Sequence, residues 1–120
     1  MASETTVLVC VTCRQGGDPN SRPGARFLEA LRAKLTDADA ERVRIRPVEC
    51  LQVCGRPCTA AFAAQGKWTY VLADLELGRI DEFILALRAY TAALDGVAPW
   101  KERPDCFKRG VVARTPPPDR

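Results

Sequence analysis

The sequence has no histidine, no long apolar run and almost no excess of charge of either sign. Without histidine there can be no Ser-His-Asp triad, no Cys-His protease pair, no His-ligated zinc and no Rieske-type centre. Any bound metal must therefore be held mainly by thiolates or carboxylates, and any general base must be a carboxylate, Lys, Tyr or Cys. Six cysteines are present instead, at positions 10, 13, 50, 54, 58 and 106.

No apolar stretch approaches the roughly 20 residues that a membrane-spanning helix needs. The first residues also lack the basic region and apolar core of a secretory signal. The length of 120 residues fits one domain with one hydrophobic core. These features predict a cytoplasmic protein without a membrane partner.

The net charge of +3 comes from the last twenty residues. Residues 101–120 carry six basic and three acidic groups, whereas residues 1–100 carry twelve of each. A protein that tracks phosphates usually shows a basic face on its folded domain, so we expect no nucleic-acid partner. We interpret the charged end as a solvated segment, with a docking arm for an acidic partner as the alternative.

Apolar periodicity predicts a strand, a helix and a second strand in the first half of the chain. The β-branched run Thr5 to Cys10 indicates a buried strand, and the alternation in Arg42 to Val48 indicates a strand with one exposed face. Between them, a helix that opens near Pro23 repeats apolar residues along one buried face. These apolar residues are Phe27, Leu28, Leu31 and Leu35.

The second half predicts a hairpin, a helix and a tail. Thr59 to Ala64 and Lys67 to Leu72 flank a Gln-Gly turn, which is typical of a β-hairpin. Apolar residues from Ile80 to Leu94 keep the period of a helix. Because a β-α-β unit makes parallel strands, residues 1–97 are predicted to form a small mixed sheet covered by two helices. Residues 98–120 are predicted to be an extended, Pro-rich tail.

Five cysteines follow the two strands that should be parallel. Cys10-x-x-Cys13 comes after the first strand, and Cys50-x3-Cys54-x3-Cys58 comes after the second. Parallel strands end at the same edge of a sheet, and neighbours lie about 4.8 Å apart. We therefore expect the two groups to meet. The sixth cysteine, Cys106, is not expected to be a ligand.

Converging thiols in a reducing compartment indicate metal binding or redox chemistry rather than structural disulfides. Four thiolates suit a [2Fe–2S] cluster and equally a tetrahedral zinc site. The Cys50–Cys58 loop contains Gly55 and Pro57 and no acidic residue, which favours iron–sulfur because its backbone N–H groups can point at sulfur. Arg14 and Arg56 either offset the negative charge of a cluster or are solvated loop residues.

A thiol–disulfide oxidoreductase is a further interpretation of the same cysteines. It would keep its redox pair at Cys10-x-x-Cys13, with Pro57 as a cis-proline. A redox pair benefits from an adjacent helix N-terminus, whereas Arg14 to Asn20 separate this pair from the predicted helix. The spacing therefore favours a metal centre.

Several segments resemble an uncharacterised bacterial family of small predicted metal-binding proteins. This family is similar in turn to thioredoxin-like [2Fe–2S] ferredoxins, whose second cysteine pair is also C-x3-C after a strand. The resemblance implies a thioredoxin-like fold, a one-electron carrier and a homodimer. The resembling segments are Val9–Arg14, Val48–Cys58, Gly66–Tyr70, Val97–Pro104 and Gly110–Pro117.

The resemblance also implies ligands. Cys50 and Cys54 take the second ligand pair, and Cys10 takes the first position at the end of the first strand. Those ferredoxins space their first pair more widely than C-x-x-C, so Cys13 departs from their pattern. Cys58 is an extra cysteine, which is either an alternative ligand, a buried residue or a redox partner. Genes of family members often lie near cobalamin or metal-handling genes, which suggests a tetrapyrrole or cobalamin enzyme as redox partner, or a role in metal trafficking.

We therefore predict an α/β, thioredoxin-like domain that binds one [2Fe–2S] cluster through Cys10, Cys13, Cys50 and Cys54, with Cys58 as the alternative ligand. Its predicted role is electron transfer as a small ferredoxin, not enzymatic catalysis. A zinc or cobalt protein that uses the same four thiolates is the alternative, and thiol–disulfide exchange comes third.

Overall fold

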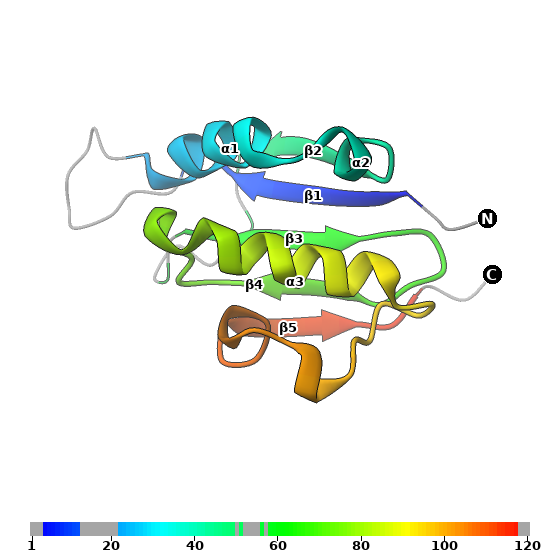
Figure 1. Ribbon diagram of the computed structural model, residues 1–120. Coiled ribbons are helices and arrows are strands. Elements are labelled where there is room, and N and C mark those ends of the chain that lie inside the picture. The colour runs from blue at the N-terminus through cyan, green and yellow to red at the C-terminus, as the bar shows by residue number, and fades with distance from the viewer. Residues whose placement is uncertain (1–3, 13–21, 50, 52–55, 57, 118–120) are drawn as a thin grey trace.

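One five-stranded mixed sheet forms the centre of the computed structural model, which describes residues 4–12, 22–49, 51, 56 and 58–117 (Figure 1). The strands lie in the order β2-β1-β3-β4-β5. β1 and β2 run parallel, and the other neighbours run antiparallel. The strands are β1 (Thr5–Cys10), β2 (Val43–Val48), β3 (Ala60–Ala63), β4 (Thr69–Leu72) and β5 (Val111–Thr115).

Two helices cover one face of this sheet. α1 (Pro23–Lys34) connects β1 to β2, and α3 (Ile80–Ala92) crosses in front of β3 and β4 (Figure 1). The two helices meet through Phe27 and Phe83, whose rings pack edge to face with centroids 4.9 Å apart. The predicted sheet with two covering helices is therefore confirmed. Among the described residues, no helix is both long and apolar enough to cross a membrane.

The core fills the space between the helices and the sheet. Val7 and Val9 of β1 are fully buried, whereas the alternate residues Thr6 and Leu8 are partly exposed. Phe62 of β3 is fully buried, and its ring centroid lies 5.2 Å from that of Phe83. Burial of each such side chain stabilises the fold by about 1.5–3 kcal/mol relative to exposure.

A buried lysine ties the hairpin to the end of α3. Lys67 is 5 % exposed, and its Nζ donates to the carbonyl oxygen of Thr91 at 2.9 Å. Burial lowers the pKa of Lys67. Thr91 also shares a 2.9 Å hydroxyl hydrogen bond with Thr5, at the start of β1. Lys67 thus satisfies a carbonyl group in the last turn of the helix, where carbonyl groups have no partner within the helix.

The chain after α3 differs in detail from the prediction. Leu94 was expected on the apolar face of the helix, but α3 ends at Ala92 and Leu94 is 95 % exposed. Gly96 adopts a φ of 82°, which glycine tolerates without steric cost. The sheet also gains β5 from within the predicted extended tail, while the predicted boundary between residues 97 and 98 stays a prediction.

The part of the chain that the structure describes also contains three short 3-10 turns: η1 (Leu77–Arg79), η2 (Trp100–Glu102) and η3 (Asp105–Phe107). Phe107 is fully buried, and its ring lies 4.9 Å from that of Tyr70. The segment between α3 and β5 is therefore anchored to the core by an aromatic residue that the sequence pattern did not single out.

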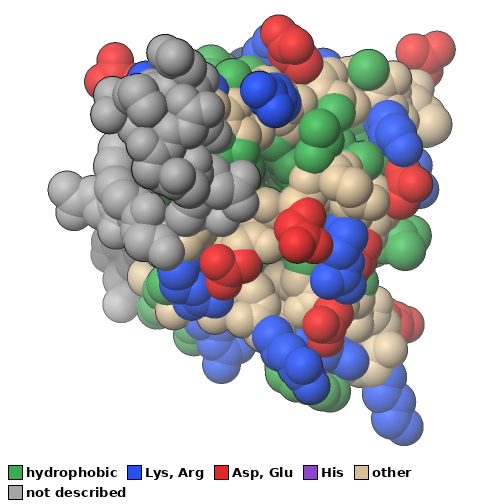
Figure 2. Space-filling model, turned by 90° about the vertical axis from the view of Figure 1, so that its left-hand side faces the viewer, with side chains coloured by type: hydrophobic (Ala, Val, Ile, Leu, Met, Phe, Trp, Pro, Cys, Tyr) green, Lys and Arg blue, Asp and Glu red, His purple; other side chains and the backbone are tan. Residues whose placement is uncertain are grey.

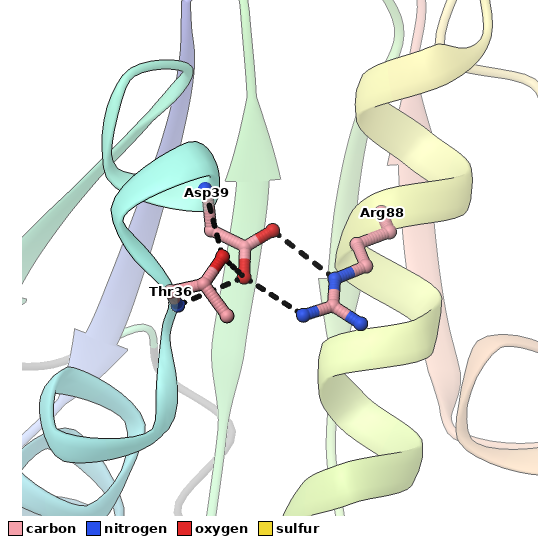
Figure 3. A network of polar contacts seen from close by, with 3 residues as sticks. All are labelled: Thr36, Asp39 and Arg88. Atoms are coloured by element: carbon pink, nitrogen blue, oxygen red, sulfur yellow. Dashed lines mark hydrogen bonds and ion pairs between the residues drawn. The ribbon is translucent and has the colours of Figure 1, made fainter.

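A one-turn helix, α2 (Asp37–Ala40), is joined to α3 by a polar network (Figure 3). Thr36 caps it, since its Oγ1 accepts from the N–H of Asp39 while Asp39 Oδ2 accepts from the N–H of Thr36. Arg88 donates from Nε and Nη2 to the two carboxylate oxygens of Asp39, at 3.1 and 2.8 Å. The hydrogen bonds from Arg88 hold the pKa of Asp39 well below its usual range.

Asp39→Asn should lower the free energy of unfolding by about 1 kcal/mol at pH 7, because Arg88 is half exposed and its ion pair is partly screened. The pKa of Asp39 is lower in the folded chain, so this stabilisation exists above the usual carboxyl pKa of about 4 and is lost as the pH falls below it. Urea denaturation at neutral and acidic pH would show the difference between the two proteins shrinking in acid.

Asp81→Asn is the matched control, because its carboxylate pairs with Lys34 but is 81 % exposed. This variant should change the stability by less than about 0.5 kcal/mol at either pH. Equal losses from the two substitutions would contradict the special role given to Asp39.

Candidate metal centre at the strand ends

The C-terminal ends of β1 and β2 lie side by side, as their parallel arrangement predicts. Cys10 is opposite Val48 in the register, and the N–H of Val11 donates to the carbonyl oxygen of Val48 at 3.0 Å. The thiol of Cys10 donates to the carbonyl oxygen of Glu49 at 3.6 Å. Cys50 is the next residue in the chain. The buried Cys10 thiol therefore contacts the main chain directly before the second cysteine group.

Three predicted ligands, Cys13, Cys50 and Cys54, lie outside the described residues, so the ligand set stays a prediction. Within the described ranges, no group of three or more His, Cys, Asp or Glu side chains could hold a metal ion. Thr12 strengthens the junction, because its hydroxyl donates to the carbonyl oxygen of Glu49 and lies 3.9 Å from the Cys10 thiol.

The start of β3 lies at the same edge. The N–H of Cys10 donates to the carbonyl oxygen of Thr59 at 3.1 Å. Cys58, which precedes Thr59, is 2 % exposed and borders a hollow of about 180 Å³ together with Pro23 and Arg26 of α1. The buried position of Cys58 is one of its predicted roles, and its use as a ligand or redox partner stays a prediction.

The N-terminus of α1 packs against Cys10. Gly24, the second residue of α1, lies so close that a Cβ at this position would overlap the carbonyl oxygen of Cys10. Residues Arg14 to Asn20 therefore separate Cys10 from the helix in sequence but not in space. The unpaired N–H groups at a helix N-terminus carry partial positive charge, which stabilises a thiolate or another negative group nearby.

The residues after β4 form main-chain hydrogen bonds to the residues that precede β3. The N–H of Asp74 donates to the carbonyl oxygen of Arg56 at 3.1 Å, and the N–H of Leu75 donates to that of Cys58 at 3.0 Å. Asp74 has a φ of 57°, in the left-handed region that Asp tolerates better than most residues. No sequence signal distinguishes Asp74 from an ordinary turn aspartate.

Arg56, one of the two arginines that could offset the charge of a cluster, is paired with Asp74. Its Nε donates to Asp74 Oδ2 at 2.8 Å, and its Nη2 lies 2.6 Å from the same oxygen. Asp74 therefore neutralises Arg56, and the second predicted cation, Arg14, lies outside the described residues. Figure 2, which looks onto this end of the sheet, shows acidic and basic side chains next to one another on the described surface.

Cys106 has the chemistry of a structural thiol. It is a free, half-buried cysteine in η3, and its N–H donates to Glu82 Oε1 at 2.8 Å. Burial, and then the charge of Glu82, raise the pKa of the Cys106 thiol to about 12. A thiol that is so difficult to ionise is a poor metal ligand, which supports the prediction that Cys106 is not one.

Gly24→Ala should lower the free energy of unfolding by about 2 kcal/mol, because the start of α1 must move away from Cys10 to admit the methyl group. Gly78→Ala is the matched control, since Gly78 is exposed and no atom lies within 4 Å of a Cβ built there. It should change stability by less than about 0.5 kcal/mol. Urea denaturation would compare the two, and similar stabilities would refute the close contact.

Comparison with known proteins identifies the fold. Residues 7–117 match a family model described as "Protein of unknown function (DUF1636)". A structure of a thioredoxin-like [2Fe–2S] ferredoxin from Aquifex aeolicus is similar over 99% of this chain and 99% of that chain, with a TM-score of 0.64 and 19% sequence identity. Among curated proteins, none matches the sequence.

Two further structures of the Aquifex aeolicus ferredoxin are also similar to this chain. The wild type has a TM-score of 0.60 and 18% identity, covering 93% of this chain and 99% of that chain. A variant with one cysteine replaced by serine has a TM-score of 0.61 and 16% identity, covering 91% and 98%. The predicted thioredoxin-like α/β fold is confirmed.

Proposed function

Since the chain belongs to the DUF1636 family, we propose that this protein is a small [2Fe–2S] ferredoxin that carries one electron at a time. The membership agrees with the family predicted from the sequence, and the fold is that of thioredoxin-like [2Fe–2S] ferredoxins. The observation that carries the proposal is the contact between the Cys10 thiol and the carbonyl oxygen of Glu49. It joins the two cysteine-bearing segments at one edge of the sheet.

The donor set suits the cluster. A [2Fe–2S] cluster takes four thiolates, and the proposed ligands are Cys10, Cys13, Cys50 and Cys54. Cys58 is the alternative ligand, which is supported by the hydrogen bond that brings its neighbour Thr59 to Cys10. The bound cluster would supply the one-electron redox step.

The chain itself contributes rigidity and electrostatics to this site. β1 is paired on both sides, by β2 and β3, so the main chain at Cys10 is fixed. A cluster with four thiolates is negatively charged, and Arg56 is already paired with Asp74. The start of α1 packs on the main chain of Cys10, so its helix dipole adds positive potential at this end of β1. Burial of Cys10 keeps water away from the sulfur, which tunes the redox potential.

Electron transfer requires a redox partner protein. An enzyme of tetrapyrrole or cobalamin metabolism stays the predicted partner, and a homodimer and a cytoplasmic location likewise stay predictions. In this proposal the protein passes electrons to an enzyme and does not itself transform a substrate.

Anaerobically purified protein should be red-brown, with visible bands between about 400 and 550 nm and about two irons and two sulfides per chain. Absorbance spectroscopy, with iron and acid-labile sulfide assayed on the same sample, tests this. Stoichiometric zinc or cobalt without sulfide would instead favour a metal-binding protein that uses the same thiolates. A colourless, metal-free sample with free thiols would favour thiol–disulfide exchange.

Cys50→Ala and Cys54→Ala should each abolish the visible bands, because each substitution removes a thiolate ligand and alanine offers no atom that can bind iron. Cys106→Ala is the matched control and should keep them, since its thiol resists ionisation. Comparing Cys13→Ala with Cys58→Ala identifies the fourth ligand as the position whose loss bleaches the protein. Unchanged spectra in both the Cys50 and Cys54 variants would refute the ligand assignment.

A further inference from the structure

A groove of about 450 Å³ lies between β5 and the turn that contains Trp100. Four consecutive residues of β5, 111–114, line it. Because alternate residues of a strand point to opposite faces, a groove lined by consecutive residues follows the edge of the strand. β5 is the last strand of the described sheet. Such an edge offers main-chain N–H and C=O groups to an extended peptide.

The groove is positively charged. Arg103, Lys108 and Arg114 line it, and no Asp or Glu is among its described lining residues. Across the described ranges, neither Lys108 nor Arg114 forms an ion pair with a carboxylate. Instead, Lys108 lies 5.4 Å from the ring centroid of Trp100, and Arg114 lies 4.6 Å from that of Trp68. Aromatic rings position these cations without neutralising them.

The groove also presents apolar side chains on a fixed support. Trp100 is 63 % exposed and Val112 is 40 % exposed. Arg103 holds the Trp100 turn against the sheet, because its Nε donates to the carbonyl oxygen of Ala98 at 2.9 Å and its Nη2 to the Tyr70 hydroxyl at 3.2 Å. Tryptophan and arginine on a rigid support are the residue types that dominate binding energy in protein interfaces.

We propose that this groove binds an extended segment of a partner protein in which acidic residues alternate with apolar ones. The segment adds to the free edge of β5, its carboxylates meet Lys108 and Arg114, and its apolar side chains pack on Trp100 and Val112. A second copy of this chain fits poorly, because a symmetric pairing would bring the same cations together. Nucleic acid also fits poorly, because two cations without an acidic partner can neutralise only a few backbone phosphates.

The proposal stands apart from the proposed [2Fe–2S] cluster, because no predicted ligand lines the groove. The two features are nevertheless connected through the main chain. Ala73 donates to the carbonyl oxygen of Gly110, directly before β5, at 2.8 Å. Its second neighbour, Leu75, donates to the carbonyl oxygen of Cys58. A segment bound along β5 would thus contact a strand that is joined to the cysteine-bearing edge.

Phage display tests the chemistry of the ligand. A random library of ten-residue peptides is panned against the anaerobically purified full chain. The expected enrichment is of sequences in which Asp or Glu alternates with apolar residues. A selected peptide is then labelled with fluorescein, and its affinity is measured by anisotropy at physiological ionic strength. Arg114→Gln and Lys108→Gln should each weaken binding about fivefold, which is typical of one partly screened charge contact.

Arg46→Gln is the matched control, because Arg46 is an exposed arginine on β2, at the other edge of the described sheet. This variant should bind the peptide as tightly as the wild type does. No enrichment, enrichment without acidic residues, or an equal loss in Arg46→Gln and Arg114→Gln would overturn the proposal.

N-methylation of the selected peptide separates strand addition from simple charge attraction. An added strand uses the main-chain groups of alternate residues. Methylation of one alternate set of amides should therefore abolish binding, while methylation of the other set should leave it intact. Equal effects of the two sets would overturn strand addition. Tighter binding of a single-stranded oligonucleotide, or release of the peptide by self-association of the chain, would overturn the choice of partner.

Discussion

The double pairing of β1 is the constraint on which the rest of the structure depends. β2 runs parallel to it on one side and β3 runs antiparallel on the other, so β1 cannot shift without breaking both ladders. This pairing fixes Cys10 at the end of the strand, with its N–H bonded to Thr59 and its thiol at Glu49. The start of α1 fits against this fixed point because Gly24 has no side chain. The candidate metal centre is thus built at the end of a strand that is paired on both sides.

Elements with a regular apolar period could be predicted from the sequence, because burial imposes that period. β1, α1 and β4 follow this rule, whereas β3 is a continuous buried run that the Gln-Gly turn after it helped to predict. β5 could not be predicted in this way, since four of its five residues are exposed and it is a strand only because β4 offers it an edge. The burial of Phe107 could not be predicted either, because only the fold brings this isolated aromatic residue against Tyr70.

The parts of the candidate site that follow from the order and direction of the strands could be predicted from the sequence. Side-chain pairs between residues far apart in the chain could not. Parallel strands must end at one edge, so the meeting of Cys10 with the chain before Cys50 follows from the order of the elements. The partner of Arg56 does not follow, because Asp74 is distant in sequence and reaches Arg56 only through a left-handed turn. Of the four predicted ligands, the structure describes Cys10. The complete ligand set must therefore be identified by chemical experiments on the cysteine variants.

The three residues after β4 connect the two functional surfaces proposed for this protein. Their N–H groups bond in turn to Gly110, Arg56 and Cys58, so one short segment joins the start of β5 to the chain before β3. These are main-chain bonds, so they do not depend on which side chains flank them. Asp74 at the centre of the segment has a left-handed conformation, which prevents the segment from relaxing into a continuous strand. The groove proposed beside β5 and the residues that border the candidate metal centre are therefore linked by three consecutive main-chain hydrogen bonds.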